Sequence, residues 1–370
     1  MGRLNELERY GQAVWLDFVD RRFLADGGLT ALVAEDGVTG VTSNPSIFEK
    51  AMGHGDAYDD SLAAFDRAHP GASAMARYEH LAIGDIRTAA DILRPVYHRL
   101  DGRDGYVSLE VSPMLAHDSD GTIAEAARLW QAVDRPNLMI KIPGTPAGVP
   151  AIAATIDAGI NVNVTLLFSI AAYQAVALAY VEGLERRVAR GLPIDRIASV
   201  ASFFVSRIDS KIDDRIDGGT GGEAAKALKG RVAIANAKLA YAWYQEFIAS
   251  DRWRALAAKG AMPQRLLWAS TGTKNPDYPD TLYVDTLIGA ETVNTMPPKT
   301  MDAFRDHGTP AATLATDIAG ARAVIADAAR LGLDLDGVTT VLVDEGVRSF
   351  MQAFDDLLGA IAAKHPVAAA

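Results

Sequence analysis

The sequence predicts a single α/β domain built as a (β/α)8 barrel. Eight short apolar segments of strand length alternate with amphipathic, alanine-rich segments of helical length along the 370 residues. Several apolar segments lack alternating polar residues, as expected for parallel strands that are covered on both faces. A doubly wound open sheet would also alternate strands with helices, but eight such units favour closure into a barrel.

Each expected strand is a short apolar run that ends near a polar residue or a turn signal. The eight strands are expected at residues 14–18, 37–42, 106–111, 138–142, 160–166, 198–205, 265–269 and 292–294. Helical periodicity predicts helices at residues 122–133, 148–158, 170–190 and 223–249.

Two insertions and a final helix account for the length beyond a minimal barrel. Residues 46–102 are expected to be mostly helical and to separate strands two and three. Residues 206–263 hold the long helix expected before strand seven, and a last helix is expected at residues 344–363. We therefore predict one barrel domain over residues 1–364, followed by a frayed tail at 365–370.

Composition limits the classes of function. The net charge of −11 argues against binding to nucleic acid or to acidic membranes, although a few cations in a cleft could still bind a small anion. The chain has no cysteine, which excludes a disulfide framework and a cysteine nucleophile. It has no apolar leader and no run of membrane-spanning length, so we expect a cytoplasmic protein. Its histidines form no metal-ligand pattern, and no metal site is expected.

Polar residues follow nearly every expected strand. Carboxyl-terminal strand ends meet at one end of a barrel, where barrel enzymes hold their active sites. A single buried polar group could be satisfied within the core, but so many together indicate a ligand site. The residues in question are Asp17, Thr42, Ser43, Asn44, Glu110, Lys141, Asn163, Thr165, Ser202 and Ser270, with Phe204 two residues after Ser202.

Lys141 is the most informative of these residues, because it lies in an apolar strand that Pro143 and Gly144 end. Burial favours the neutral, nucleophilic amine, which forms Schiff bases with carbonyl compounds. The alternative is a lysine that is simply paired with a buried carboxylate. Neighbouring carboxylates favour the charged form, so the sequence leaves the balance between the two effects open.

Schiff-base chemistry also requires groups that move protons. Glu110 ends the strand next to that of Lys141, and Thr165 could hold a water on the other side. Asp17 is the candidate for a second carboxylate that takes a proton from a substrate hydroxyl. Arg207 and Lys274 follow strands six and seven, where they could bind a phosphate group or could be ordinary surface charges.

Seven strings along the chain resemble the transaldolase family, at residues 38–47, 107–111, 139–145, 160–169, 201–207, 268–276 and 292–298. The resemblance implies that Lys141 forms the Schiff base, Glu110 and Thr165 hold the water of the proton relay, and Asp17 acts as acid and base. It also implies that Asn44, Asn163 and Ser202 bind the substrate or intermediate, and that Ser270 and Arg207 bind phosphate.

Two features of the chain bear on the subtype. Family members of the best-known type carry an arginine two residues after the serine of strand seven, whereas this chain has Gly272. We assign the second phosphate ligand to Lys274, and that assignment stays open. In the related fructose-6-phosphate aldolases a glutamine and a tyrosine typically replace Glu110 and Phe204, so these two residues favour transaldolase.

The resemblance implies transfer of a dihydroxyacetone unit from sedoheptulose 7-phosphate to glyceraldehyde 3-phosphate, a reaction of the pentose phosphate pathway. No cofactor is expected, and the expected partners are phosphorylated sugars. The alternatives are an aldolase that releases dihydroxyacetone and a barrel that binds sugar phosphates without catalysis. The sequence leaves open whether the protein is a monomer or a homodimer.

Overall fold

The computed structural model describes residues 2–364, in which eight parallel strands close into one barrel. The strands follow chain order, and β8 returns to pair with β1. They are β1 (Gln12–Leu16), β2 (Val38–Val41), β3 (Tyr106–Glu110), β4 (Leu138–Pro143), β5 (Val162–Leu167), β6 (Ser199–Phe204), β7 (Arg265–Ala269) and β8 (Thr292–Met296). The predicted (β/α)8 barrel is therefore confirmed.

Strand ends depend on the pairing partner as well as on the local sequence. β1 begins and ends earlier than the expected residues 14–18, and β8 extends beyond the expected 292–294. The two strands form one ladder, which pairs Gln12 with Thr292 at one end and Leu16 with Met296 at the other. Asp17 therefore follows β1 directly, and its backbone N–H donates to the Met296 carbonyl oxygen at 2.8 Å.

The ladder register brings predicted site residues to one level of the barrel. Glu110 of β3 pairs with Lys141 of β4, which pairs in turn with Asn163 of β5. Every residue of these three strands is buried, as expected for parallel strands with helices outside and side chains inside. The closed sheet thus places an amine between a carboxyl and an amide near the carboxyl-terminal ends of the strands.

The amino-terminal end of the barrel holds a separate polar cluster around the buried Asp104. Its carboxylate accepts hydrogen bonds from Nε1 of Trp15 at 2.9 Å and from Nη1 of Arg265 at 3.1 Å. Thr39 donates to the same carboxylate at 3.1 Å. These contacts satisfy the buried carboxylate of Asp104 within the protein.

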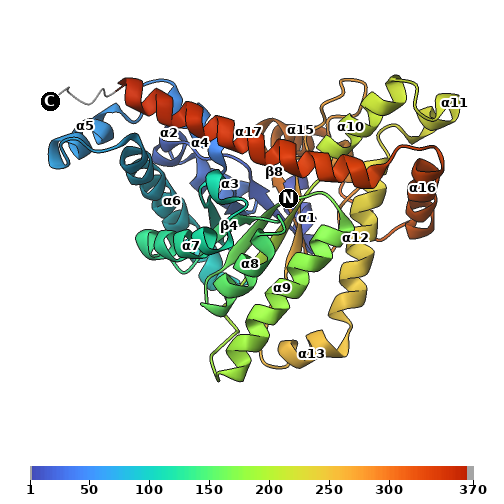
Figure 1. Ribbon diagram of the computed structural model, residues 1–370, viewed down its shortest axis with the longest axis horizontal. Coiled ribbons are helices and arrows are strands. Elements are labelled where there is room, and N and C mark those ends of the chain that lie inside the picture. Colours follow the sequence, from blue (N-terminus) through green and yellow to red (C-terminus); the bar gives the residue numbers. More distant parts are fainter. Residues whose placement is uncertain (1, 365–370) are drawn as a thin grey trace.

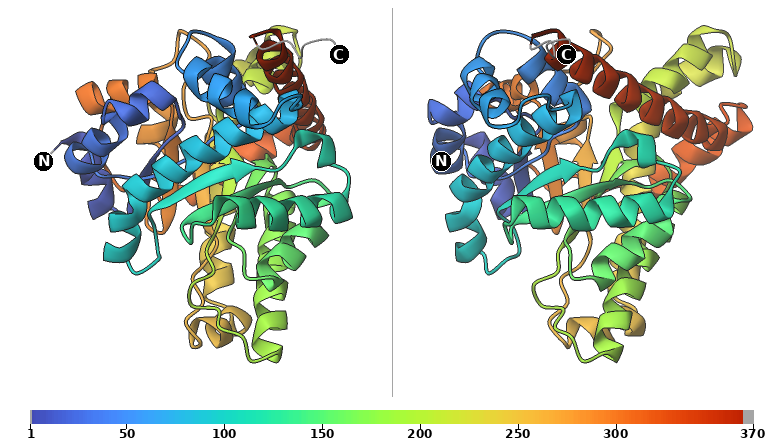
Figure 2. Two further views of the ribbon diagram at one scale, coloured as in Figure 1. Left: turned by 90° about the vertical axis from the view of Figure 1, so that its left-hand side faces the viewer. Right: turned by 60° about the vertical axis from the view of Figure 1, so that its left-hand side comes forward.

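Helices surround the barrel, and those after β3, β4 and β5 match their predictions closely (Figures 1 and 2). They are α7 (Ser119–Val133), α8 (Gly148–Asp157) and α9 (Ile170–Ala189). The insertion after β2 is helical as predicted and comprises α4 (Pro45–Gly53), α5 (Asp59–Ala68) and α6 (Ala74–Arg99). The other helices outside the β6 insertion are α1 (Arg3–Arg9), α2 (Arg21–Ala25), α3 (Gly28–Glu35), η1 (Pro113–Leu115), α14 (Leu282–Asp285), α15 (Pro298–His307), α16 (Ile318–Arg330) and α17 (Leu335–Lys364).

The prediction of a single long helix at residues 223–249 is wrong. The segment after β6 consists of α10 (Ser206–Asp217), α11 (Gly222–Ala225), η2 (Lys226–Leu228), α12 (Val232–Ile248) and α13 (Asp251–Ala257). Gly230 breaks the helix with a left-handed φ of 68°, a conformation that glycine adopts at little cost. Asp209 of α10 then accepts a hydrogen bond from the Ala233 backbone N–H at 2.8 Å, and so satisfies a free donor in the first turn of α12.

The final helix, α17, begins at Leu335 rather than at the predicted residue 344. Asp334 satisfies a free donor in its first turn by accepting a hydrogen bond from the Gly337 N–H at 3.1 Å. The helix crosses the carboxyl-terminal end of the barrel and packs against α4, α6 and α10 (Figures 1 and 2). The tail predicted at 365–370 lies outside the described residues. Within residues 2–364, no helix has the length and apolarity needed to cross a membrane.

Candidate active site

Lys141 is buried at the centre of the carboxyl-terminal end of the barrel, with an exposed fraction of 4%. Its ammonium Nζ donates to the backbone carbonyl of Ser43 at 3.0 Å and lies 3.3 Å from Oε2 of Glu110. The third neighbour is the ring of Phe350, whose centroid is 5.8 Å from Nζ. The nitrogen is therefore in contact with a carbonyl, a carboxyl and an aromatic face inside the protein.

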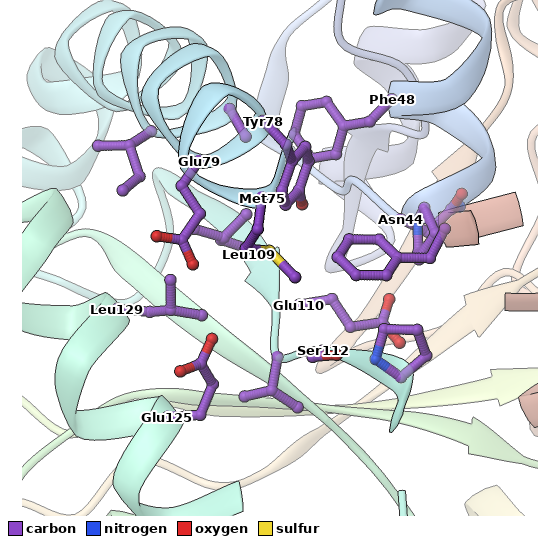
Figure 3. A pocket seen from close by; sticks show the side chains of 16 residues that line it. Asn44, Phe48, Met75, Tyr78, Glu79, Leu109, Glu110, Ser112, Glu125 and Leu129 are labelled. Carbon is purple, nitrogen blue, oxygen red and sulfur yellow. The ribbon is translucent and has the colours of Figure 1, made fainter. Parts of the chain in front are cut away.

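Glu110 is buried beside this nitrogen, and its Oε2 forms an ion pair with Lys141. Burial raises the pKa of Glu110, while the positive charge of Lys141 opposes the shift. The side chain borders a small cavity of about 20 Å³ between β3, α4, α6 and α7, which has room for about one water molecule (Figure 3). Glu110 thus combines a raised pKa with an adjacent space for a water, as expected of a group that passes a proton to a water or ligand.

Asn44 lies at the rim of the same cavity, where it caps α4. Its side-chain oxygen accepts a hydrogen bond from the Ile47 N–H at 2.9 Å. The cap fixes the oxygen, and Figure 3 shows Asn44 beside Glu110 in the pocket. The side-chain NH2 group is therefore the part of Asn44 that can serve a ligand.

Asp17 is held by a short chain of hydroxyl groups. Thr42 donates to Oδ1 of Asp17 at 2.6 Å, and the oxygen atoms of Thr42 and Thr295 are 2.7 Å apart. Burial raises the pKa of Asp17, and the hydrogen bond from Thr42 is the largest opposing effect. The carboxylate is thus fixed in one orientation by residues that follow β2 and lie in β8.

A second line of hydrogen bonds crosses the barrel beside Lys141. Ser202 donates to Oδ1 of Asn163 at 2.7 Å, and Asn163 donates to Oγ of Ser108 at 2.9 Å. Thr165 lies two residues beyond Asn163 in β5, and its buried hydroxyl has no partner. An unpartnered buried hydroxyl is costly in a native protein, and a bound water or substrate group at this position would satisfy it.

Cations lie at the side of the site formed by β6 and β7. The charges of Arg207 and Lys274 both lower the pKa of Asp17, so both are within electrostatic reach of that carboxylate. The Arg207 guanidinium lies 5.2 Å from the ring centre of Phe204, and burial lowers the pKa of this arginine. Lys274 is exposed in the loop after β7 and makes no ion pair within the part of the chain that the structure describes.

Two serines join the loops that follow β6 and β7. The Oγ atoms of Ser206 and Ser270 are 2.9 Å apart, and the Ser206 N–H donates to the Ser270 carbonyl at 3.1 Å. Ser270 has a φ of 56°, a left-handed conformation that is uncommon for serine and that is found at functional sites. Hydroxyl groups and a guanidinium, supplied by the first turn of α10 and the loop after β7, are suitable ligands for a phosphate group.

Buried carboxylates of α10 anchor this helix, whose first turn contains Arg207. Oδ2 of Asp209 accepts a hydrogen bond from the Tyr283 hydroxyl at 3.0 Å, in addition to the bond from Ala233. Asp213 accepts from the Tyr278 hydroxyl at 2.5 Å. Burial raises the pKa of Asp209 to about 7.

The structure brings most predicted site residues together, and it adds others. Thr42 and Thr295 orient Asp17, Ser206 joins Ser270, and Phe350 faces Lys141. Thr42 is among the polar residues that the sequence places at strand ends, and Ser206 lies in one of the seven strings that resemble the family. No feature of the sequence distinguishes Phe350, because it resembles any apolar position of an amphipathic helix. Among residues 2–364, no group of three or more ligating side chains is arranged to hold a metal ion.

The chain is similar to known proteins over nearly its whole length. The sequence profile described as Transaldolase/Fructose-6-phosphate aldolase matches residues 14–361. A transaldolase of Thiobacillus denitrificans is 52% identical over 361 residues, which cover 98% of this chain and 100% of the relative. A transaldolase of Trichodesmium erythraeum is 48% identical over 98% of this chain and 97% of its own length. A third, from Thermobifida fusca, is 50% identical over 97% of both chains.

Asp209→Asn should change how stability depends on pH. Because burial raises the pKa from 3.8 to about 7, the stabilising contribution of this carboxyl is complete below pH 3.8 and is lost as the pH rises through about 7. The wild-type free energy of unfolding should therefore fall relative to the variant by up to about 1.4 kcal/mol per pH unit in this range. Urea unfolding at several pH values measures the difference.

Asp214→Asn is the matched control, since Asp214 is exposed on the same helix. Its effect on the free energy of unfolding should not vary over this pH range. A constant difference between wild type and Asp209→Asn would contradict the account of Asp209.

Proposed function

Because the chain belongs to the transaldolase/fructose-6-phosphate aldolase family, we propose that it transfers a dihydroxyacetone unit through a Schiff base on Lys141. The donor is sedoheptulose 7-phosphate and the acceptor is glyceraldehyde 3-phosphate, and the products are erythrose 4-phosphate and fructose 6-phosphate. The observation that carries the proposal is the buried amine of Lys141, 3.3 Å from the Glu110 carboxyl. The two groups supply the nucleophile and the acid that imine formation requires.

Imine formation uses the residues around the nitrogen. The neutral amine of Lys141 attacks the ketose carbonyl carbon and gives a carbinolamine. Glu110 supplies a proton through a water that Thr165 also binds, and the carbinolamine hydroxyl leaves as water. Two observations support these roles, the raised pKa of Glu110 and the unpartnered hydroxyl of Thr165.

Cleavage and transfer use Asp17. The iminium ion accepts the electron pair of the bond between C3 and C4, while Asp17 takes the proton of the C4 hydroxyl and an aldose leaves. The resulting enamine attacks the acceptor aldehyde, and Asp17 returns its proton to the new hydroxyl. Hydrolysis of the imine then releases the product ketose. The hydrogen bond from Thr42 orients Asp17 for both proton transfers.

The remaining predicted residues bind the substrate. Asn163 and Ser202 contact the hydroxyl groups of the three-carbon unit, since their hydrogen-bonded pair lies beside Lys141 in the ladder. Asn44 contributes its side-chain NH2 group from the rim of the cavity. Phe204 packs against Arg207 at the side of the site where the phosphate binds.

Arg207, Ser270 and Lys274 bind the phosphate group. Arg207 is partly buried and within electrostatic reach of Asp17, whereas Lys274 is exposed in its loop. A guanidinium that is held by packing binds a phosphate in a defined geometry, while a mobile ammonium acts as a point charge. Arg207 is therefore the main ligand of the phosphate, and Lys274 adds to its attraction.

Borohydride added with fructose 6-phosphate should attach the sugar to the peptide that contains Lys141, because reduction converts the imine to a stable amine. Lys141→Met removes the nitrogen but keeps a long apolar side chain, and it should abolish both labelling and transfer. Peptide mass spectrometry and a coupled assay measure the two results. Lys211→Met is the control, because this lysine pairs with Glu345 away from the nitrogen and should leave both unchanged.

The same assay separates transfer from simple cleavage. Without an aldehyde acceptor, free dihydroxyacetone should be released from fructose 6-phosphate much more slowly than transfer proceeds with the acceptor present. Equal rates would identify an aldolase instead. Labelling of a different lysine, or binding without turnover, would contradict the proposed function.

Arg207→Ala should raise KM for phosphorylated substrates by about 10- to 100-fold, since a hydrogen bond to a charged group contributes about 1.5–3 kcal/mol. KM for unphosphorylated fructose should change little. Lys211→Ala, a cation one turn along α10, is the control and should leave both values unchanged. Equal losses for phosphorylated and unphosphorylated substrates would remove Arg207 from the phosphate site.

A further inference from the structure

Helix α17 is fixed directly over the reacting end of the barrel. Its Gly346 lies against Leu166 of β5, where a Cβ atom on the glycine would be only 2.8 Å from Cδ2 of the leucine. Leu166 has a left-handed φ of 60°, at the point where the pairing of β5 with β6 is interrupted. The backbone of the strand is therefore shaped to meet the helix, and a side chain at position 346 would disturb this contact.

Close packing at Gly346 fixes the distance between Lys141 and the next turn of α17. Phe350, one turn further along α17, is 3% exposed, and its ring centroid lies 5.8 Å from Nζ of Lys141. This separation is within the range in which an aromatic face attracts a cation. The attraction is stronger at a buried nitrogen than at an exposed one, because water does not compete for the charge.

We propose that Phe350 is a further active-site residue, whose ring stabilises the positive charge on the Lys141 nitrogen in the iminium intermediate. This inference rests on the proposed Schiff base at Lys141. The nitrogen is cationic in the iminium and neutral in the carbinolamine, so the ring favours the imine over its precursor. Glu110 cannot stabilise the iminium charge alone, because it exchanges protons while the carbinolamine converts to the iminium. The ring of Phe350 carries no titratable group and is unchanged throughout.

The position of the ring in the fold supports the assignment. Phe350 reaches the nitrogen from a helix that is remote in sequence, while the other two neighbours are Ser43, which follows β2, and Glu110, which ends β3. Figures 1 and 2 show α17 passing over this end of the barrel. The ring therefore adds to the surroundings of the nitrogen an aromatic face that these strands do not supply.

Phe354 offers a matched control on the same helix. It is also 3% exposed, and its ring packs edge-on against Tyr78 with centroids 5.2 Å apart. It lines the cavity behind Glu110 rather than facing Lys141. Phe350→Leu and Phe354→Leu thus remove the same atoms from two neighbouring turns of α17, and only the first removes an aromatic face from the nitrogen.

The test compares imine formation with ordinary binding. Borohydride labelling at Lys141 over a range of fructose 6-phosphate concentrations gives the half-saturating concentration for the imine. Binding of glucitol 6-phosphate, which has no carbonyl, gives the noncovalent affinity. Phe350→Leu should raise the first value about threefold to tenfold and leave the second within twofold. Phe354→Leu should change neither value by more than twofold, although it should lower the melting temperature by a similar amount.

The other possible outcomes test the inference and the proposed function separately. Equal effects of the two variants on labelling, or a parallel loss of glucitol 6-phosphate binding in Phe350→Leu, would overturn the inference, since both indicate a packing role. Failure of the wild-type protein to label at Lys141 would instead overturn the proposed function itself. The two failures are therefore distinguished by the wild-type measurement.

Discussion

The site depends on one buried pair of groups, the amine of Lys141 and the carboxyl of Glu110, at the ends of adjacent strands. Burial disfavours a charged pair relative to a neutral one, and groups 3.3 Å apart share their protons. In the proposed mechanism Lys141 is the nucleophile, and Glu110 is the acid that lies beside it. Burial raises the pKa of Glu110, and the charge of Lys141 opposes this shift.

In the closed barrel, different strands and loops supply the residues for the other proposed roles. The residues after β2 and in β8 hold Asp17 through two threonines, and β5 and β6 supply the asparagine and serine beside Lys141. The loops after β6 and β7 supply hydroxyl groups and cations. In the proposed mechanism the phosphate and the reacting carbon are therefore bound by different elements, so the phosphate can anchor a sugar without occupying the groups that react.

The sequence was sufficient for the features that depend on local pattern. Eight apolar runs predicted the barrel, and the polar residues at their ends predicted Lys141, Glu110 and Asp17 as one group. Features that depend on tertiary contacts were not predictable in this way. The break at Gly230 is stabilised by carboxylates of α10, and the early start of α17 depends on a side chain that caps it. Phe350 is distinguished from other apolar residues of α17 only by what it faces.

A crystal structure of the borohydride-reduced complex with fructose 6-phosphate tests the central claim most directly. The account predicts continuous electron density from Nζ of Lys141 to C2 of the sugar, with the phosphate at Arg207 and Ser270. It also predicts that Asp17 lies within hydrogen-bond distance of the C4 hydroxyl. Density that joins the sugar to another lysine, or a sugar bound with its phosphate away from Arg207, would contradict the account.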